Sequence, residues 1–185
     1  MSENKVETVE FPEADESVGE YCRSWAAGSF NDFITRESLD LLGKYLTDSA
    51  VSVFSKEMIE IPEPLSTDIS IDVSEQLTNL VEISASDVPI EELKTFSEKV
   101  DAVLRKVVRE GIDMERMKMI IERDELKLLN ALEDKPSDSL QDTLVNDFLF
   151  GDLEGKDLYS SLEDRKRYKE LSGWSSMQWT DLIQK

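Results

Sequence analysis

The feature that most constrains the fold is a change in hydrophobic period near residue 87. Before it, apolar and polar residues alternate over residues 68–73 and 77–85, which is the pattern of half-buried strands. After it, apolar residues recur at helical spacing almost to residue 185. This division predicts one α+β domain of 185 residues, with residues 1–87 mainly in strands and residues 88–185 mainly helical.

The N-terminal half is predicted to contribute about four strands to a mixed or antiparallel sheet. Residues 6–11 and 19–27 are the first two candidates, and an acidic turn separates them. Residues 74–76 are expected to connect the two strongly alternating segments as a hairpin. Two short helices are predicted between the strand pairs: residues 35–46, and a helix from about residue 48 with Val51, Phe54 and Met58 on one face.

Capping residues predict where the two long helices begin and end. Asp87 is the predicted N-cap of the first helix, and Gly111 ends it. Asp113 is the predicted N-cap of the second helix, which ends near residue 135. Its apolar stripe is interrupted by Asp124 and Glu125.

These long helices, within residues 88–133, are expected to cover one face of the sheet, with an accessory helical layer behind them. The further predicted helices are residues 137–150, residues 156–171, and a last helix that follows a capping box of Ser175 and Gln178. Because that last helix has no C-terminal stop signal, we expect the domain to be truncated at its C-terminus.

The sequence contains no histidine, and this restricts the chemistry of the chain. A Ser-His-Asp triad, a Cys-His dyad and an H-E-x-x-H zinc helix are all excluded. A single cysteine cannot form an internal disulfide or a thiolate zinc site. We therefore expect no catalytic, cofactor-binding or metal-ligating residues and no enzymatic activity of the chain alone. Cys22 is predicted to be a small buried residue on a strand.

Charge and hydropathy also limit the partners and the location. The net charge of −20 argues against nucleic acid, because duplex binding depends on Lys and Arg replacing counterions. The sequence has no apolar run of about 18 residues and no secretory leader pattern, so we predict a cytoplasmic protein without membrane contact.

Five groups of residues are candidates for a site, and each has a simpler structural interpretation. Asp68, Asp72 and Glu75 could bind Mg²⁺ or Ca²⁺, but acids that alternate with apolar residues are typical of a solvated strand face. The acidic residues 13–20 are interpreted as a solvated turn, and the basic residues Arg165, Lys166, Arg167 and Lys169 as part of a mixed helix face. Of Met114, Met117 and Met119, the first two are expected to pack in the core. Trp174 and Trp179 are expected to be core indoles whose N–H groups reach a partner.

Several segments resemble the second domain of pitrilysin-type (insulinase-like) zinc metallopeptidases, within the presequence-peptidase-like branch. The segments that carry the resemblance are residues 11–25, 39–52, 111–117 and 162–183. The resemblance implies a non-catalytic α/β domain that supports the active domain and lines a peptide chamber, here lacking its last strand. It also implies that zinc is bound only in the full-length parent enzyme, by an inverted H-x-x-E-H motif that this chain lacks. The remaining domains of that parent would be the partners.

The uneven charge suggests which peptides such a chamber would attract. Residues 1–92 contain 5 basic and 21 acidic residues, a net charge of −16, whereas residues 93–185 have a net charge of −4. If the acidic half faces the chamber, it would attract basic peptides in a salt-dependent way, through Glu13, Asp15, Glu16, Asp68 and Asp72. The alternative is a stand-alone acidic interaction or scaffold protein without enzymatic activity.

Overall fold

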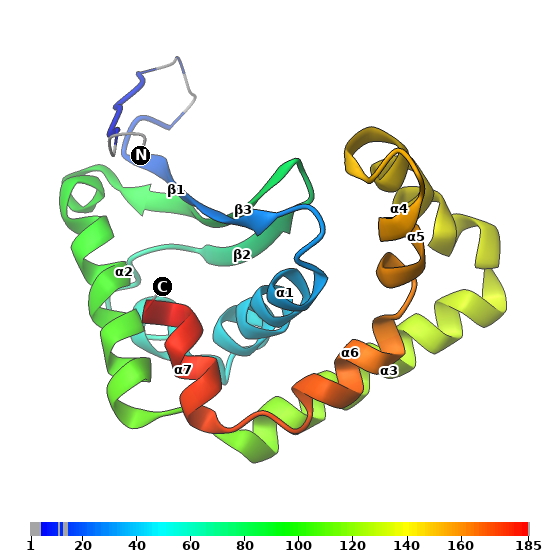
Figure 1. Ribbon diagram of the computed structural model, residues 1–185. Coiled ribbons are helices and arrows are strands. Elements are labelled where there is room, and N and C mark those ends of the chain that lie inside the picture. Colours follow the sequence, from blue (N-terminus) through cyan, green and yellow to red (C-terminus); the bar gives the residue numbers. More distant parts are fainter. Residues whose placement is uncertain (1–4, 11, 13–14, 185) are drawn as a thin grey trace.

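The computed structural model describes residues 5–184 except residues 11, 13 and 14 (Figure 1). Three strands and a set of helices make up the described chain. The strands are β1 (Val18–Ser29), β2 (Asp68–Ser74) and β3 (Thr78–Pro89); the helices are α1 (Phe33–Thr47), the π-helical turn η1 (Ser55–Ile59), α2 (Ile90–Glu110), α3 (Met114–Asp134), α4 (Pro136–Phe150), α5 (Lys156–Ser161), α6 (Asp164–Leu171) and α7 (Ser176–Gln184). The α+β class is as predicted.

The sheet is antiparallel, with the strand order β1-β3-β2. Strands β2 and β3 form the predicted hairpin, in a register that places Ile71 opposite Ile83. The prediction of a fourth strand at residues 6–11 is wrong for the described residues 6–10, which are exposed and have no strand structure. Valines at positions 6 and 9 favour extended backbone, but a strand is stable only against a partner strand, and β1 pairs with β3 instead.

One face of the sheet is covered, by α1 and α2. Helix α2 buries its predicted apolar stripe there, and Phe96 and Val100 are completely inaccessible to solvent. Helix α3 packs on α1 and α6 rather than on the sheet, so the prediction that both long helices cover the sheet is wrong for α3. The physical reason is that α1 already fills the position beside α2.

The boundaries of α2 and α3 test the predicted caps. Asp87 is not a cap, because β3 continues to Pro89 and the Asp87 carboxylate accepts a hydrogen bond from the Thr67 hydroxyl (2.6 Å). Asp113 is the predicted cap of α3: its side chain accepts hydrogen bonds from the backbone N–H groups of Glu115 (3.0 Å) and Arg116 (3.2 Å).

Three of the shorter helices differ in detail from the predictions. The helix predicted from residue 48 is only the turn η1, where Met58 is buried but Val51 is exposed. The predicted helix 156–171 is divided into α5 and α6, because the Arg167 guanidinium donates to the backbone carbonyls at the end of α5. The capping box is half formed: Ser175 donates to the Gln178 side chain, but the Gln178 N–H bonds to the Ser175 backbone carbonyl.

The hydrophobic core is confined to one part of the molecule. Its buried members come from β2, β3, η1, α1, α2, the first turns of α3, α6 and α7 and from the short segments next to them, and the described residues of α4 and α5 contribute none. We call residues 18–124 and 164–184 the body and residues 136–161 the arm. In Figure 1 the arm lies at the right, at the far end of α3. Among the described helices, none is both long enough and apolar enough to cross a membrane.

Candidate functional site

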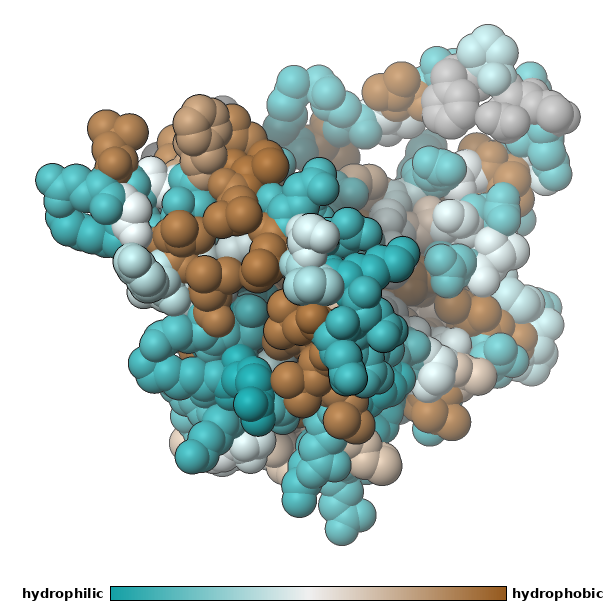
Figure 2. Space-filling model, turned by 90° about the vertical axis from the view of Figure 1, so that its right-hand side faces the viewer, coloured by the Kyte–Doolittle hydropathy of each residue, from teal (hydrophilic) through white to brown (hydrophobic). Residues whose placement is uncertain are grey.

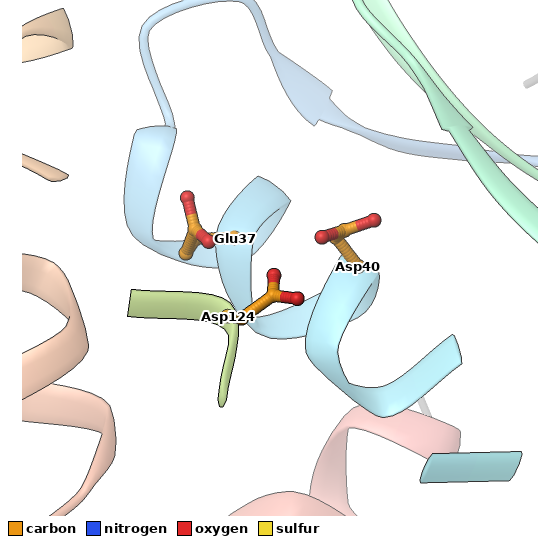
Figure 3. Close-up of side chains that lie close together, drawn as sticks. All are labelled: Glu37, Asp40 and Asp124. Carbon is orange, nitrogen blue, oxygen red and sulfur yellow. The ribbon is translucent and has the colours of Figure 1, made fainter. Parts of the chain in front are cut away.

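Three carboxylates meet where α3 crosses α1 (Figure 3). Glu37 and Asp40 lie one turn apart on α1, and Asp124 reaches them from α3. Each offers an oxygen within 4.8 Å of the others, and within the described part of the chain this is the one group of three acids that close together. We call these three residues the carboxylate cluster. Asp124 is 7% exposed, so its charge needs a partner.

Lys44 supplies that partner. Its ammonium donates to Asp40 Oδ2 at 2.5 Å and to Asp124 Oδ2 at 2.5 Å, and it comes from the same helix as Asp40. Burial opposes protonation of Lys44, but these two hydrogen bonds outweigh it and raise the pKa of the amine. An ammonium therefore takes the place between the carboxylates that a metal cation would need, and the cluster is best described as an ionic joint between α1 and α3.

The negative charge of the third carboxylate, Glu37, is less well compensated. Burial raises the pKa of Glu37, an effect that a hydrogen bond from Tyr168 opposes, and the negative charge of Asp40 raises it further. The single proton of the Tyr168 hydroxyl is shared between Glu37 and Asp124, whose Oδ2 lies 3.4 Å from the hydroxyl oxygen, and burial raises the pKa of this phenol well above its ordinary value. The cluster thus joins α1, α3 and α6 through charged and polar groups, but it offers no imidazole or thiolate for zinc.

Sequence reasoning missed this cluster. The signal was present, because Asp124 falls on the apolar stripe of α3, where a charged residue is buried unless the helix turns away. A buried acid predicts a cationic partner, but nothing in the sequence points to Lys44, which lies 80 residues earlier.

The three acids predicted as a candidate cation site are not brought together. Asp68 and Asp72 are exposed along β2, and Asp72 accepts a hydrogen bond from the Ser70 hydroxyl (2.9 Å). Glu75 is engaged elsewhere, by Arg36 (2.9 Å) and by the amide of Asn146 (3.0 Å). Of the acidic turn, Asp15 and Glu16 are exposed, and Glu13 lies outside the described residues.

The basic run is a mixed helix face, as interpreted, with one exception. Arg165 pairs with Glu125 (3.3 Å) and Lys166 with Glu163 (2.9 Å). Arg167 instead is buried, pairs with Asp164 and holds the end of α5.

The remaining candidates are mainly core residues. Met117 is fully buried and Met114 packs on the core, whereas Met119 is exposed, as predicted. Trp174 and Trp179 pack with their rings 5.0 Å apart. The expectation that both N–H groups reach a partner is wrong for Trp179, whose buried indole nitrogen has no acceptor among the described residues.

Cys22 is on the predicted strand but on the open face of the sheet, so the prediction that it is buried is wrong. The physical reason is the alternation of β1. Tyr21, Arg23 and Trp25 point toward α2, so Cys22 and Ser24 point away. Partial desolvation of the sulfur and the neighbouring Glu82 raise the pKa of the Cys22 thiol, so this thiol is a weak nucleophile although the residue is exposed.

The open face of the sheet is acidic. Asp72 is opposite Glu82, and Glu82 is opposite Ser24, whose hydroxyl donates to it (2.8 Å). Asp68 lies at the start of β2 on the same side. The strands contain one basic residue, Arg23, and it is on the covered face, where it pairs with Asp101 (2.8 Å). The uncovered face of the sheet therefore carries negative charge, and none of the three strands places a basic residue on it.

The fold has clear counterparts among solved structures. The inactive peptidase domain of a candidate zinc protease from Bordetella parapertussis superimposes with a TM-score of 0.70 at 12% identity, covering 93% of this chain and 86% of that one. A candidate M16-like peptidase from Alicyclobacillus acidocaldarius superimposes with a TM-score of 0.63 at 14% identity, covering 89% of this chain and 37% of that one. The chain thus has the fold of an M16-like peptidase domain.

The sequence relatives do not assign the chain to a more specific class of protein. The uncharacterized protein YOL098C of Saccharomyces cerevisiae is 30% identical over 176 residues, which are 95% of this chain but 17% of that protein. The chain therefore spans about a sixth of the length of this curated relative. No family model matches the chain.

Proposed function

We propose that this chain is a non-catalytic structural domain of a pitrilysin-type zinc metalloendopeptidase, with the presequence-peptidase-like branch as the specific assignment, and that it forms part of the wall of a peptide chamber in the cytoplasm. The observation that carries the proposal is the superposition on an inactive peptidase domain over nearly the whole of both chains. The length of the yeast relative is consistent with it, since the matched region is 17% of that protein and leaves enough chain for further domains of this size.

The residues of the chain fit a structural role better than a zinc-binding one. An inverzincin site needs two imidazoles and a carboxylate base, and the sequence contains no histidine. The carboxylate cluster does not replace it, because Lys44 already bridges Asp40 and Asp124. Zinc would therefore be held by another domain of the parent enzyme.

The open acidic face of the sheet is the surface that we assign to the chamber. Asp68, Asp72 and Glu82 give it a negative field, which would raise the local concentration of basic peptides and would weaken in salt. The other domains of the parent enzyme would then close the chamber around this face.

A peptidase assay tests the absence of catalysis. The purified chain, supplied with Zn²⁺, is expected to leave a mixed peptide library intact. Hydrolysis that a chelator abolishes would overturn the proposal.

A binding assay tests the acidic face. An oligolysine peptide without apolar residues should bind the chain weakly at low ionic strength, and the triple variant Asp68→Asn, Asp72→Asn, Glu82→Gln should bind it several-fold more weakly. The matched control is Glu91→Gln, Glu98→Gln and Glu110→Gln on α2, which removes three exposed acids outside this face. Equal loss in the two variants would mean that only net charge matters, and the chamber assignment would fail.

A further inference from the structure

Helix α4 of the arm exposes a row of large apolar side chains. None of the described residues of α4 is buried, although four large apolar residues lie close together near its C-terminal end. The exposed apolar side chains are Leu144 (50%), Val145 (48%), Phe148 (87%) and Leu149 (58%). We call these four residues the α4 stripe. Figure 2, which looks onto the side that carries α4 and α5, shows a band of hydrophobic residues in its upper part.

The spacing of the α4 stripe places its members on one side of the helix. Leu144 and Phe148, and Val145 and Leu149, are each four residues apart, so they form two adjacent rows over about two turns. A second helix can pack against such rows with its own side chains at i and i+4.

The opposite side of α4 is held by the rest of the molecule, so the stripe is not the loose face of a frayed helix. Phe150 packs on the Phe30 ring at 5.8 Å, and Asn146 donates to Glu75 at the β2–β3 turn (3.0 Å). Helix α4 also packs along α3 and α5. The stripe is therefore presented outward by a helix that is fixed in place.

The charges of α4 and of the turn that follows it are of one sign, between Lys135 at one end and Lys156 at the other. Residues 136–155 contain five acids and no lysine or arginine. The first base after them, Lys156, pairs with Glu154 (2.5 Å). Asp138 and Asp142 precede the stripe on the same helix, and Asp152 and Glu154 follow it; all four are exposed. A second copy of this chain would bring like charges together, whereas a basic partner would pair with them.

We propose that the α4 stripe is the docking site for a basic amphipathic helix of a partner polypeptide, with apolar side chains at i and i+4 against Phe148 and its neighbours and Lys or Arg side chains on its flanks against the acids. Two features of the same surface carry this assignment: exposed apolar area in helical register and a mainly acidic border, in which bases occur only at its ends, at Lys135 and Lys156. The proposal does not depend on the proposed peptidase role, because it concerns the arm rather than the sheet.

Titration with a defined probe tests the proposal. The probe is a fluorescent peptide of about four helical turns, built from Leu and Lys with all leucines on one face. The full chain should bind it, and should bind at least about tenfold more weakly a peptide of the same composition whose leucines are distributed around the helix. A peptide with Glu in place of every Lys should not bind.

Paired variants locate the binding site. Phe148→Ser with Leu149→Ser should weaken binding of the amphipathic probe by about tenfold or more, and Asp138→Asn with Asp142→Asn by several-fold at low salt. Because these side chains are exposed, circular dichroism should stay unchanged and the unfolding midpoint should change only slightly. The control for the apolar variant is Met119→Ser with Met177→Ser, which removes two exposed apolar residues outside the arm. Glu91→Gln with Glu98→Gln is the control for charge.

Three results would overturn the proposal. The first is equal affinity of the Phe148/Leu149 variant and the parent chain for the amphipathic probe. The second is equal affinity for the amphipathic and the redistributed peptide, which would mean that charge alone acts. The third is a dimer in light-scattering measurements that the Phe148/Leu149 variant dissociates, which would assign the stripe to a second copy. Loss of oligolysine binding in the Asp68/Asp72/Glu82 variant, with the amphipathic probe still bound, separates this site from the proposed chamber face.

Discussion

The body and the arm each contain a helix with large apolar residues at i and i+4, but these residues have opposite environments. In the body, Phe96 of α2 is completely buried between the helix and the sheet. In the arm, Phe148 of α4 is 87% exposed. The difference teaches that helical spacing predicts which residues share a face, while the topology decides whether that face meets the same chain.

The largest expected effect separates the two phenylalanines. Phe96→Ala should lower the free energy of unfolding by about 3–5 kcal/mol, because it removes a buried ring and leaves a cavity. Phe148→Ala should change it by less than about 0.5 kcal/mol, because the ring is already in water. Urea denaturation of both variants measures the difference. Similar losses of unfolding free energy in the two variants would show that the Phe148 side chain is buried and would contradict the contrast between body and arm.

The ionic joint should be the next most sensitive feature. Lys44→Met leaves Asp124 buried without its cation, so we expect a loss of about 3 kcal/mol. The double variant Lys44→Met, Asp124→Leu should recover much of this loss, because an apolar pair replaces the ion pair. Lys156→Met in the arm is the matched control, and loss of its exposed pair with Glu154 should cost less than about 0.5 kcal/mol. A double variant no more stable than Lys44→Met alone would contradict the buried-charge account.

The N-termini of α3 and α4 should differ by a smaller amount in their contribution to stability. Asp113→Ala should cost about 1 kcal/mol, because it removes the acceptor for two backbone N–H groups at the start of α3. In the arm, α4 begins without a side-chain cap, and Asp138 contributes only a first-turn charge. Asp138→Ala should therefore cost a few tenths of a kcal/mol. Thermal unfolding of the two variants distinguishes these values, and equal shifts would show that the cap of α3 contributes no more than a surface charge.

The parts of the fold that could be predicted depend on local patterns. The β2–β3 hairpin was predictable because both strands alternate and a short connection joins them. The cap at Asp113 was predictable because the cap and its helix are adjacent in sequence. The same alternation that places Trp25 inside places Cys22 outside, so the alternation of β1 in a sheet covered on one face was enough to assign Cys22 correctly.

The parts that could not be predicted depend on contacts between distant segments. The pairing of Lys44 with Asp124 joins residues 80 positions apart, and no local rule specifies it. The position of α3 on α1 rather than on the sheet depends on how much of the sheet α1 and α2 already cover. The outward direction of the α4 stripe has the same origin, because spacing defines the stripe and tertiary packing turns it to solvent.

The smallest expected effect concerns pH and the carboxylate cluster. Burial raises the pKa of Glu37 in the folded protein above the ordinary value of 4.5, so the folded state holds this proton more tightly than the unfolded state. The stability that Glu37 contributes is therefore complete below pH 4.5 and is lost as the pH rises through the folded value. Glu37→Gln should make the protein slightly more stable than the parent at pH 7, since the amide can still accept from Tyr168, and the difference should vanish below pH 4.5. Asp142→Asn, an exposed acid of the arm, is the control. Urea denaturation across this pH range measures the effect, and a Glu37→Gln variant that is less stable at pH 7 would show that the ionised carboxylate is a net stabilising partner of Lys44.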